Sequence, residues 1–307
     1  MKCSKSVLPT VTIALGLWAM ANWSASAGTI FSDNFATDSS LAQPPWYNIS
    51  SSSTATYALN PTAGQGLALT VSSGTGRDQE MFAQFASSPV TLANAGDYIT
   101  LTVNFNGSGM AVDTGALLVG LYNTEGTPGN GDEVNTDTGG ATADDKGYFG
   151  DMGYNTSAGL STKFDTRTGS ATDANELGYY SKMTSGSYNQ LSSFSASGNA
   201  DLADNTAYTL TYTIMNNGSS GNIMTAQIIN GVSTLDNWVT TDTTGTGGAG
   251  LYNSFDELVF GNYGKAGPVG INITSVSVDY VQAVPEPSVF ALAGLGLFGL
   301  VLRFRRR

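Results

Sequence analysis

The side chains that could do chemistry in this chain are mostly carboxylates. The sequence contains no histidine, and its only cysteine, Cys3, lies in an N-terminal segment that we expect to be removed. Catalytic bases and nucleophiles are therefore limited to Asp, Glu, Lys, Tyr and Ser. Glycoside hydrolysis is the natural reaction for carboxylates, because it needs two carboxyl groups that flank the scissile bond.

Two pairs of acids come closest to this requirement. Asp78 and Glu80 have the i, i+2 spacing that places both side chains on one face of a strand, but no third acid follows them. Asp256 and Glu257 are adjacent, so a strand would point them to opposite faces. We expect all four acids to be solvated side chains, and the sequence predicts no catalytic residue.

Another group of acids crowds one polar segment, residues 124–145. Asp132, Asn135 and Asp137 form its centre, and carboxylate and amide oxygens are the ligands that Ca²⁺ prefers. The spacing does not match an EF-hand loop. These three residues are a candidate Ca²⁺ site, and the alternative is a polar surface loop without a metal.

Aromatic rings that stand beside polar residues could bind sugars by stacking. Trp46, Tyr47 and Trp238 lie in segments that we expect to be loops, which makes them candidate glycan-binding residues, and Tyr179 and Tyr180 are weaker candidates. Sandwich cores use the same residue types. Packing in the core or at its rim is therefore the competing interpretation.

The segments that must position these residues have the period of β-strands. Apolar and polar residues alternate in 97–105, 207–215 and 222–230, and a short polar loop joins the last two, which predicts a hairpin. In 271–281 the alternation slips by one residue near Thr274, as a β-bulge requires. Outside the two ends of the chain, no window has helical periodicity.

These patterns predict one all-β domain, an antiparallel two-sheet β-sandwich over residues 28–283, with roughly ten to fourteen strands. Leu117–Leu121 is apolar on both faces, which predicts a strand buried between layers. The domain holds 6 basic and 23 acidic residues, a net charge of −17. Because this charge repels phosphates, we exclude nucleic acids and anionic lipid surfaces as partners of the domain.

The N-terminus has the pattern of a signal peptide. Lys2 and Lys5 precede an apolar run, residues 11–20, and Ala25-Ser26-Ala27 supplies small residues for cleavage. We expect residues 1–27 to be removed by cleavage after Ala27. The remaining chain then has no thiol for a disulfide or a thiolate metal site.

The C-terminal segment, residues 284–307, has three parts in order. Pro285, Glu286 and Pro287 form a stiff extended stretch. The apolar run 289–302 would rise about 21 Å as a helix, which spans the roughly 30 Å hydrocarbon layer only marginally. The positive-inside rule puts the arginines that follow on the cytoplasmic side and the domain outside. These arginines are Arg303, Arg305, Arg306 and Arg307.

This arrangement resembles the PEP-CTERM sorting signal of Gram-negative bacteria. The resemblance implies that an exosortase-type membrane enzyme processes the tail, that the apolar helix holds the precursor in the membrane, and that export accompanies exopolysaccharide production. The domain resembles the concanavalin A-like jelly rolls of lectins and glucanases in segments 33–35, 117–122, 208–214 and 255–262. It lacks the E-x-D-x-E strand that such glucanases carry.

The sequence therefore predicts an exported, non-enzymatic protein of the cell surface or extracellular matrix. Its expected role is structural or glycan-associating, with polysaccharide as a partner. Two alternatives stay open. One is a carbohydrate-active enzyme, a hydrolase or lyase, with an acid pair that the spacing does not reveal. The other is a calcium-dependent adhesin.

Overall fold

The computed structural model describes residues 26–35, 46–50, 55–60, 66–71, 77–111, 115–128, 133–134, 145–156, 160–168, 188–245, 250–264 and 268–283. These residues form 18 β-strands and two short 3₁₀ turns. This is more than the roughly ten to fourteen strands that a sandwich of this length suggests, partly because several strands have only two to four residues. In this part of the chain no helix is long and apolar enough to cross a membrane.

One of the two main sheets, sheet 1, has eight strands. They are β1 (Ser26–Asp33), β3 (Ala55–Asn60), β4 (Gly66–Val71), β7 (Tyr98–Ser108), β13 (Tyr208–Asn216), β14 (Asn222–Asn230), β15 (Ser233–Asp242) and β18 (Val269–Gln282). Their order is β15-β14-β13-β7-β18-β4-β3, and β1 pairs with β18 beside this path. All these pairs are antiparallel.

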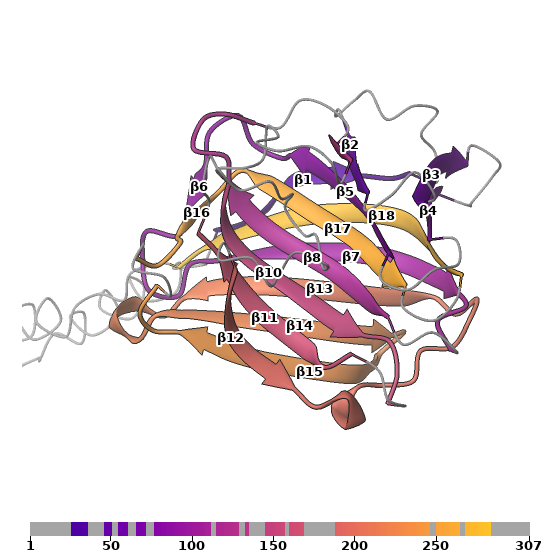
Figure 1. The fold of residues 1–307 in the computed structure, drawn as a ribbon. Helices are drawn as coiled ribbons and strands as arrows, with labels where there is room; N and C mark the ends of the chain where they lie inside the picture. The colour runs from indigo at the N-terminus through magenta and orange to yellow at the C-terminus, as the bar shows by residue number, and fades with distance from the viewer. Residues whose placement is uncertain are drawn as a thin grey trace, which may run out of the picture.

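The other main sheet, sheet 2, also has eight strands. They are β2 (Tyr47–Ser50), β5 (Arg77–Gln84), β8 (Ala116–Asn123), β9 (Glu133–Val134), β10 (Lys146–Gly153), β11 (Thr162–Arg167), β12 (Tyr188–Phe194) and β17 (Glu257–Gly264). Their order is β12-β11-β10-β8-β17-β5-β2-β9, and only the β2–β9 pair is parallel. β6 (Val90–Thr91) pairs separately with β16 (Ser254–Phe255). The sheets form two layers, so the antiparallel two-sheet sandwich is confirmed (Figure 1).

Three local predictions are also confirmed. β13 and β14 form the expected hairpin. The register of β18 against β7 shifts between Ile273 and Ser275, where the sequence predicts a bulge. β8 is buried along nearly its whole length, as expected for a strand that is apolar on both faces.

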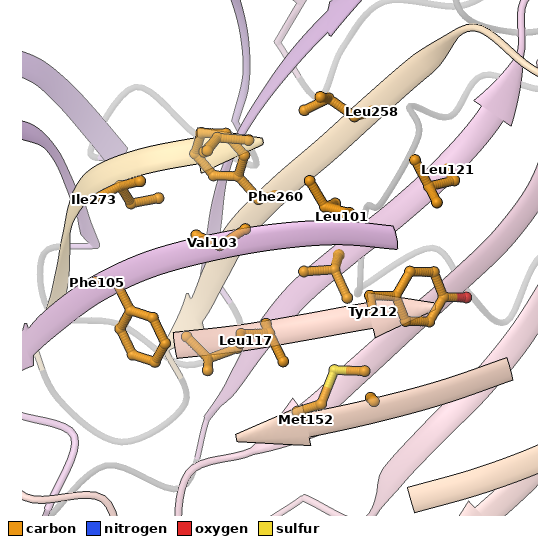
Figure 2. Packing of buried hydrophobic residues seen from close by; sticks show 14 of the residues in the cluster. Leu101, Val103, Phe105, Leu117, Leu121, Met152, Tyr212, Leu258, Phe260 and Ile273 are labelled. Atoms are coloured by element: carbon orange, nitrogen blue, oxygen red, sulfur yellow. The ribbon is translucent and has the colours of Figure 1, made fainter. Parts of the chain in front are cut away.

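The main core lies between the sheets, because every second residue of each strand points inward. Figure 2 shows Phe105 of sheet 1 beside Leu117 of sheet 2, and Leu101 of sheet 1 and Met152 of sheet 2 belong to the same cluster. The rings of Phe164 on β11 and Tyr212 on β13 stack with centroids 6.1 Å apart, which ties the two sheets together.

Each sheet also has an outer face, which points away from the other sheet. On sheet 1 this face is built of Thr, Ser and Asn side chains and is half-exposed along β7, β13 and β18. On sheet 2 every residue of β8 except the last, and every residue of β17, is buried on both sides. The outer face of sheet 2 therefore carries a second buried cluster.

Candidate functional site

The outer face of sheet 2 is the candidate site, and side-chain alternation defines which residues belong to it. In β17, Leu258 and Phe260 point into the main core, whereas Val259 belongs to a separate cluster. Because strand neighbours point to opposite sides, Glu257 shares the outer face with Val259. The buried members of this outer cluster are Phe82, Ala116, Leu118, Tyr122, Phe149, Tyr188, Val259 and Tyr263.

Strand β5 brings two acids to the same face. Met81 and Ala83 lie in the main core and Phe82 in the outer cluster. Asp78 and Glu80 therefore point outward beside Phe82, and both are buried. The expectation that these acids are solvated is wrong, because they share their face with an apolar cluster that excludes water.

The other acid pair is also buried rather than solvated. The carboxylate of Asp256, just before β17, accepts hydrogen bonds of 2.9 Å from the backbone N–H and the hydroxyl of Thr124. Glu257 begins β17 and lies on the outer face of sheet 2. The two acids thus occupy different environments, and only Glu257 belongs to the candidate site.

The strand register places the remaining polar residues of the site in three rows that run from β12 or β11 toward β5. The first row is Tyr188, Arg167, Gly147, Tyr122, Glu257 and Gln84. The second row is Gln190, Asp165, Phe149, Gly120, Val259 and Phe82. The third row is Lys163, Asp151, Leu118, Gly261 and Glu80. Acids, cations and aromatic rings therefore lie side by side on one surface.

Two glycines let side chains lie flat against this surface. A Cβ at Gly120 would stand 2.5 Å from the Tyr122 ring, and one at Gly261 would stand 2.6 Å from the Glu80 side chain. Tyr122 therefore covers Gly120 of its own strand, and Glu80 covers Gly261 of the neighbouring strand. This close packing fixes the direction of both side chains.

Tyr122, Arg167 and Tyr188 form a polar group in the first row. The guanidinium carbon of Arg167 lies 5.9 Å from the centroid of the Tyr188 ring, which is a cation–π distance. Tyr122 and Tyr188 are joined by a side-chain hydrogen bond. Burial raises the pKa of both phenols, Arg167 opposes this rise and Glu80 adds to it. Both tyrosines therefore remain protonated at neutral pH and act as hydrogen-bond donors.

Asp151 and Asp165 form a carboxyl pair across β10 and β11. Asp151 pairs with Lys163, and Asp165 pairs with Phe149, so the two acids are diagonal neighbours. Diagonal neighbours have Cβ atoms roughly 7 Å apart. Asp151 is fully buried and Asp165 is 4% exposed. No side chain of the described residues hydrogen-bonds to either carboxylate oxygen of Asp151 or to Oδ2 of Asp165.

The two carboxyl groups of this pair differ in acidity. Burial raises the pKa of Asp151 to about 8, Lys163 partly opposes the rise and Asp165 adds to it. Burial also raises the pKa of Asp165 to about 6, again against the charge of Lys163. At neutral pH, Asp151 is therefore mainly protonated and Asp165 mainly ionised.

The candidate site is partly exposed at its margins. Lys163 on β11 is half-buried, and Gln190 on β12, which pairs with Asp165, is exposed. On the opposite side Tyr47 is half-buried against the outer cluster, with its ring centroid 5.4 Å from that of Phe82. Of the three predicted glycan-binding residues, Tyr47 alone borders the candidate site.

The other two predicted glycan-binding residues lie in the main core. Trp46 is 5% exposed, packs against Phe35 and Phe260, and donates its ring N–H to Asp33 at 2.6 Å. Trp238 is 4% exposed and points inward from the middle of β15, not from a loop. Neither ring has a free face for a sugar, so the competing core interpretation holds for both.

Several predicted residues lie outside the described residues. They are Asp132, Asn135 and Asp137 of the candidate Ca²⁺ site, the weaker glycan-binding candidates Tyr179 and Tyr180, the sorting tripeptide Pro285, Glu286 and Pro287, and the four C-terminal arginines. Within the described residues, no three acidic side chains gather closely enough to hold a metal ion. β1 begins at Ser26, so the predicted cleavage after Ala27 would remove the first two residues of this strand.

Asp151, Asp165 and Arg167 were not predicted as site residues. A usable signal was present, because Lys163, Asp165 and Arg167 alternate with Thr162, Phe164 and Thr166 and so share one face of a strand. What the sequence does not supply is the register that brings Asp151 beside them.

Residues 283–307 match the model of the PEP-CTERM protein-sorting motif. These residues are a PEP-CTERM sorting motif. The predicted resemblance is thereby confirmed for the tail, and the motif indicates a secreted protein that is sorted to the cell surface or the extracellular space. No curated relative matches this chain.

Solved structures with a similar fold include lectin-like domains. The legume lectin-like domain from Entamoeba histolytica has 13% identity and a TM-score of 0.44, over 83% of this chain and 98% of that one. Arcelin-5, a lectin-like defense protein from Phaseolus vulgaris, has 12% identity and a TM-score of 0.39, over 83% and 98%. The PL-14 alginate lyase from Aplysia kurodai has 11% identity and a TM-score of 0.45, over 82% and 98%. At these TM-scores the likeness assigns neither a ligand nor a reaction.

Proposed function

We propose that this PEP-CTERM protein is a non-enzymatic component of the cell surface or extracellular matrix that binds polysaccharide through the outer face of sheet 2. On its route there, the apolar run 289–302 holds the precursor in the membrane while an exosortase-type enzyme processes the tail near Glu286. The sorting motif at residues 283–307 supports this route.

The polysaccharide proposal rests on one observation. The outer face of sheet 2 carries both aromatic rings and ionisable groups. Sugars are held by aromatic rings that stack on them and by a few polar groups that bind their hydroxyls. Tyr47 supplies a half-buried ring at one margin of this face, and Lys163 and Gln190 supply polar groups at the other. Burying an acid without a full set of hydrogen bonds costs stability. The presence of Asp151 in this position therefore supports a functional role for this face.

A binding assay on the exposed margin of this face tests the proposal. Lys163→Ala and Gln190→Ala should each weaken binding to the polysaccharide of the producing cells by about tenfold, since each removes hydrogen bonds to the glycan. Thr225→Ala and Gln227→Ala on sheet 1 are matched controls and should bind normally. If both margin variants bind like the unmodified protein, the outer face of sheet 2 is not the binding surface. If no polysaccharide is retained at all, the domain is a scaffold.

The processing step has a separate test. Mass spectrometry of the extracellular protein should find a C-terminus near Glu286. An extracellular form that ends at Arg307 would contradict exosortase-type processing, whatever the domain binds.

The carboxyl pair favours a second candidate function, which is glycoside hydrolysis. Diagonal strand neighbours have Cβ atoms roughly 7 Å apart, and this spacing allows the carboxyl separation of inverting glycosidases. In that reaction Asp165 would take a proton from a water molecule as its oxygen bonds to the anomeric carbon. Asp151 would give its proton to the leaving oxygen as the glycosidic bond breaks.

This second function predicts a pH profile. Reducing-sugar release should be greatest between about pH 6 and 8, because Asp165 must be ionised and Asp151 protonated. Asp151→Asn and Asp165→Asn should each abolish it while binding persists. Polysaccharide binding without any release of reducing sugar would leave the non-enzymatic proposal standing alone.

A further inference from the structure

A separate candidate site lies on the opposite side of the molecule, on the outer face of sheet 1. It is a pocket of about 360 Å³ beside the bulge of β18. This volume is at the lower end of the roughly 300–1,000 Å³ that small-ligand pockets occupy. The polar side chains of this pocket are half-exposed and open to solvent, whereas those on the outer face of sheet 2 are mostly buried. The residues that matter for binding are Asn104, Asn106, Thr209, Ile229, Thr274 and Ser275.

The bulge creates this pocket. Between Ile273 and Ser275 the register of β18 shifts, so Thr274 is the extra residue opposite β7. The Thr274 hydroxyl donates to the backbone carbonyl oxygen of Asn104 at 3.2 Å, which fixes the bulge against the neighbouring strand. The regular row of side chains is interrupted there, and a hollow remains over β7, between the start of β13 and the middle of β18.

Hydrogen bonds hold the floor of the pocket in one arrangement. Asn104 donates from its amide nitrogen to the Ser275 hydroxyl at 2.9 Å and accepts from the Thr209 hydroxyl at 2.6 Å. One amide hydrogen of Asn104 and the hydroxyl hydrogen of Ser275 are left for a ligand. The Asn106 side chain makes no hydrogen bond within the described residues, so its whole amide faces outward for use. Asn104 and Asn106 stand about 7 Å apart on one face of β7.

The pocket carries no charge. None of its lining residues is Asp, Glu, Lys or Arg, although the chain contains 24 acidic residues. A charged ligand would therefore leave its charge without a partner there. The lining instead offers amide and hydroxyl groups, which match the paired donors and acceptors of sugar hydroxyls, and Ile229, which can cover an apolar sugar face.

We propose that the bulge pocket binds one or two residues of a neutral sugar, such as a hexose unit with neighbouring free hydroxyls. This inference goes beyond the proposed function, because it adds a binding site that is independent of the outer face of sheet 2. A domain that binds glycan on two opposite faces can join two polysaccharide chains.

Titration of the purified protein with oligosaccharides tests the inference. The probes are neutral gluco-, galacto- and manno-oligosaccharides, with a uronate oligosaccharide as the charged comparison. At least one neutral probe should bind with an affinity that does not change between low and high salt, because no charge is involved. Asn106→Ala should weaken this binding about tenfold, and the fold should be unaffected because this side chain supports no other group.

Matched variants separate the pocket from the rest of the sheet. Thr209→Val and Ser275→Ala lie in the pocket and should weaken binding, whereas Thr211→Val and Ser277→Ala lie two residues away on the same strands and face, and should not. Lys163→Ala on sheet 2 should leave the neutral probe bound, which distinguishes this site from the proposed function. Equal binding by Asn106→Ala and the unmodified protein, preference for the uronate probe, or no binding of any neutral probe would each overturn the inference.

Discussion

The outer faces of the two sheets differ in their polarity and in their exposure to water. The outer face of sheet 1 is half-exposed and mostly uncharged, and its hydroxyls and amides bond to one another across the strands, as Thr100 does to Thr213 at 2.9 Å. The outer face of sheet 2 is buried and holds acids, Arg167 and several aromatic rings. Sheet 1 follows the ordinary rule for a half-exposed antiparallel sheet. Sheet 2 departs from it.

This difference between the outer faces indicates where a function is to be sought on each. On sheet 1 the departures from regularity are local, and the bulge at Thr274 is the one that makes a pocket. On sheet 2 the departure extends over many strands, because ionisable groups are held out of water at a cost in stability. Such sites are expected where stability has been exchanged for binding or chemistry.

The largest expected effect comes from the close packing of the sheet 2 face. Gly261→Ala should lower the free energy of unfolding by about 3 kcal/mol. The new Cβ would stand 2.4 Å from the backbone oxygen of Gln79 and 2.8 Å from the Cα of Glu80, neither of which can move easily. Urea unfolding followed by fluorescence measures the change.

Gly270 on sheet 1 provides the matched control. It also lies in a strand and on an outer face, but the nearest atom to a Cβ there would be the Ser108 hydroxyl oxygen, at 3.1 Å. Gly270→Ala should therefore change the unfolding free energy by less than about 1 kcal/mol. Equal losses for the two variants would mean that the faces are packed alike, and the contrast would fail.

The next largest effect depends on pH. The folded-state pKa of Asp151 is raised from 3.8 to about 8, so the folded protein holds its proton longer than the unfolded chain does. Below about pH 4 both states are protonated and the group costs nothing. As the pH rises toward 8, the unfolded chain ionises first and the folded state loses stability relative to it.

Asp151→Asn should remove this loss. The free energy of unfolding of the variant should equal that of the unmodified protein near pH 4 and exceed it by about 2 kcal/mol at pH 8. This figure allows for the amide's own hydrogen-bonding needs. For Asp165→Asn the gain in the free energy of unfolding should reach its full size near pH 6, because the pKa of Asp165 lies there. Melting temperatures across this pH range measure both. A constant difference at every pH would show that the carboxyl groups are not desolvated.

The contrast between the faces also explains what could be predicted from the sequence. β7, β13 and β18 are recognisable because one side is polar and the other apolar, and this produces strict alternation. The bulge follows from a slip in the same alternation. On sheet 2, β5 and β11 are not predicted as strands, because charged and apolar residues occur on their outer face without a simple rule and acidic residues are rare in strands. β12 is not predicted either, because its residues are mostly polar and do not alternate.

The candidate site was out of reach for a related reason. Asp151 and Asp165 are 14 positions apart in the sequence, and only the register of β10 with β11 makes them neighbours. The burial of the two tryptophans was not predicted, because polar residues lie close to each in the sequence, Asn48 near Trp46 and Asn237 before Trp238. In β15, however, Asp236, Trp238 and Asp242 are buried while most of the residues around them are exposed, so Trp238 points inward from an otherwise exposed strand.

The smallest expected effect compares one hydroxyl from each face. Tyr188→Phe should lower the unfolding free energy by about 1 kcal/mol, because the buried Tyr122 hydroxyl loses a hydrogen-bond partner that water does not replace. Thr213→Val should change it by less than about 0.5 kcal/mol, because the Thr100 hydroxyl is half-exposed and can bond to water instead. Both substitutions preserve the shape of the side chain, so the difference isolates burial. If Thr213→Val costs as much as Tyr188→Phe, the hydroxyl rows of sheet 1 are as sheltered from water as the sheet 2 face, and the distinction between a wet and a dry face is lost.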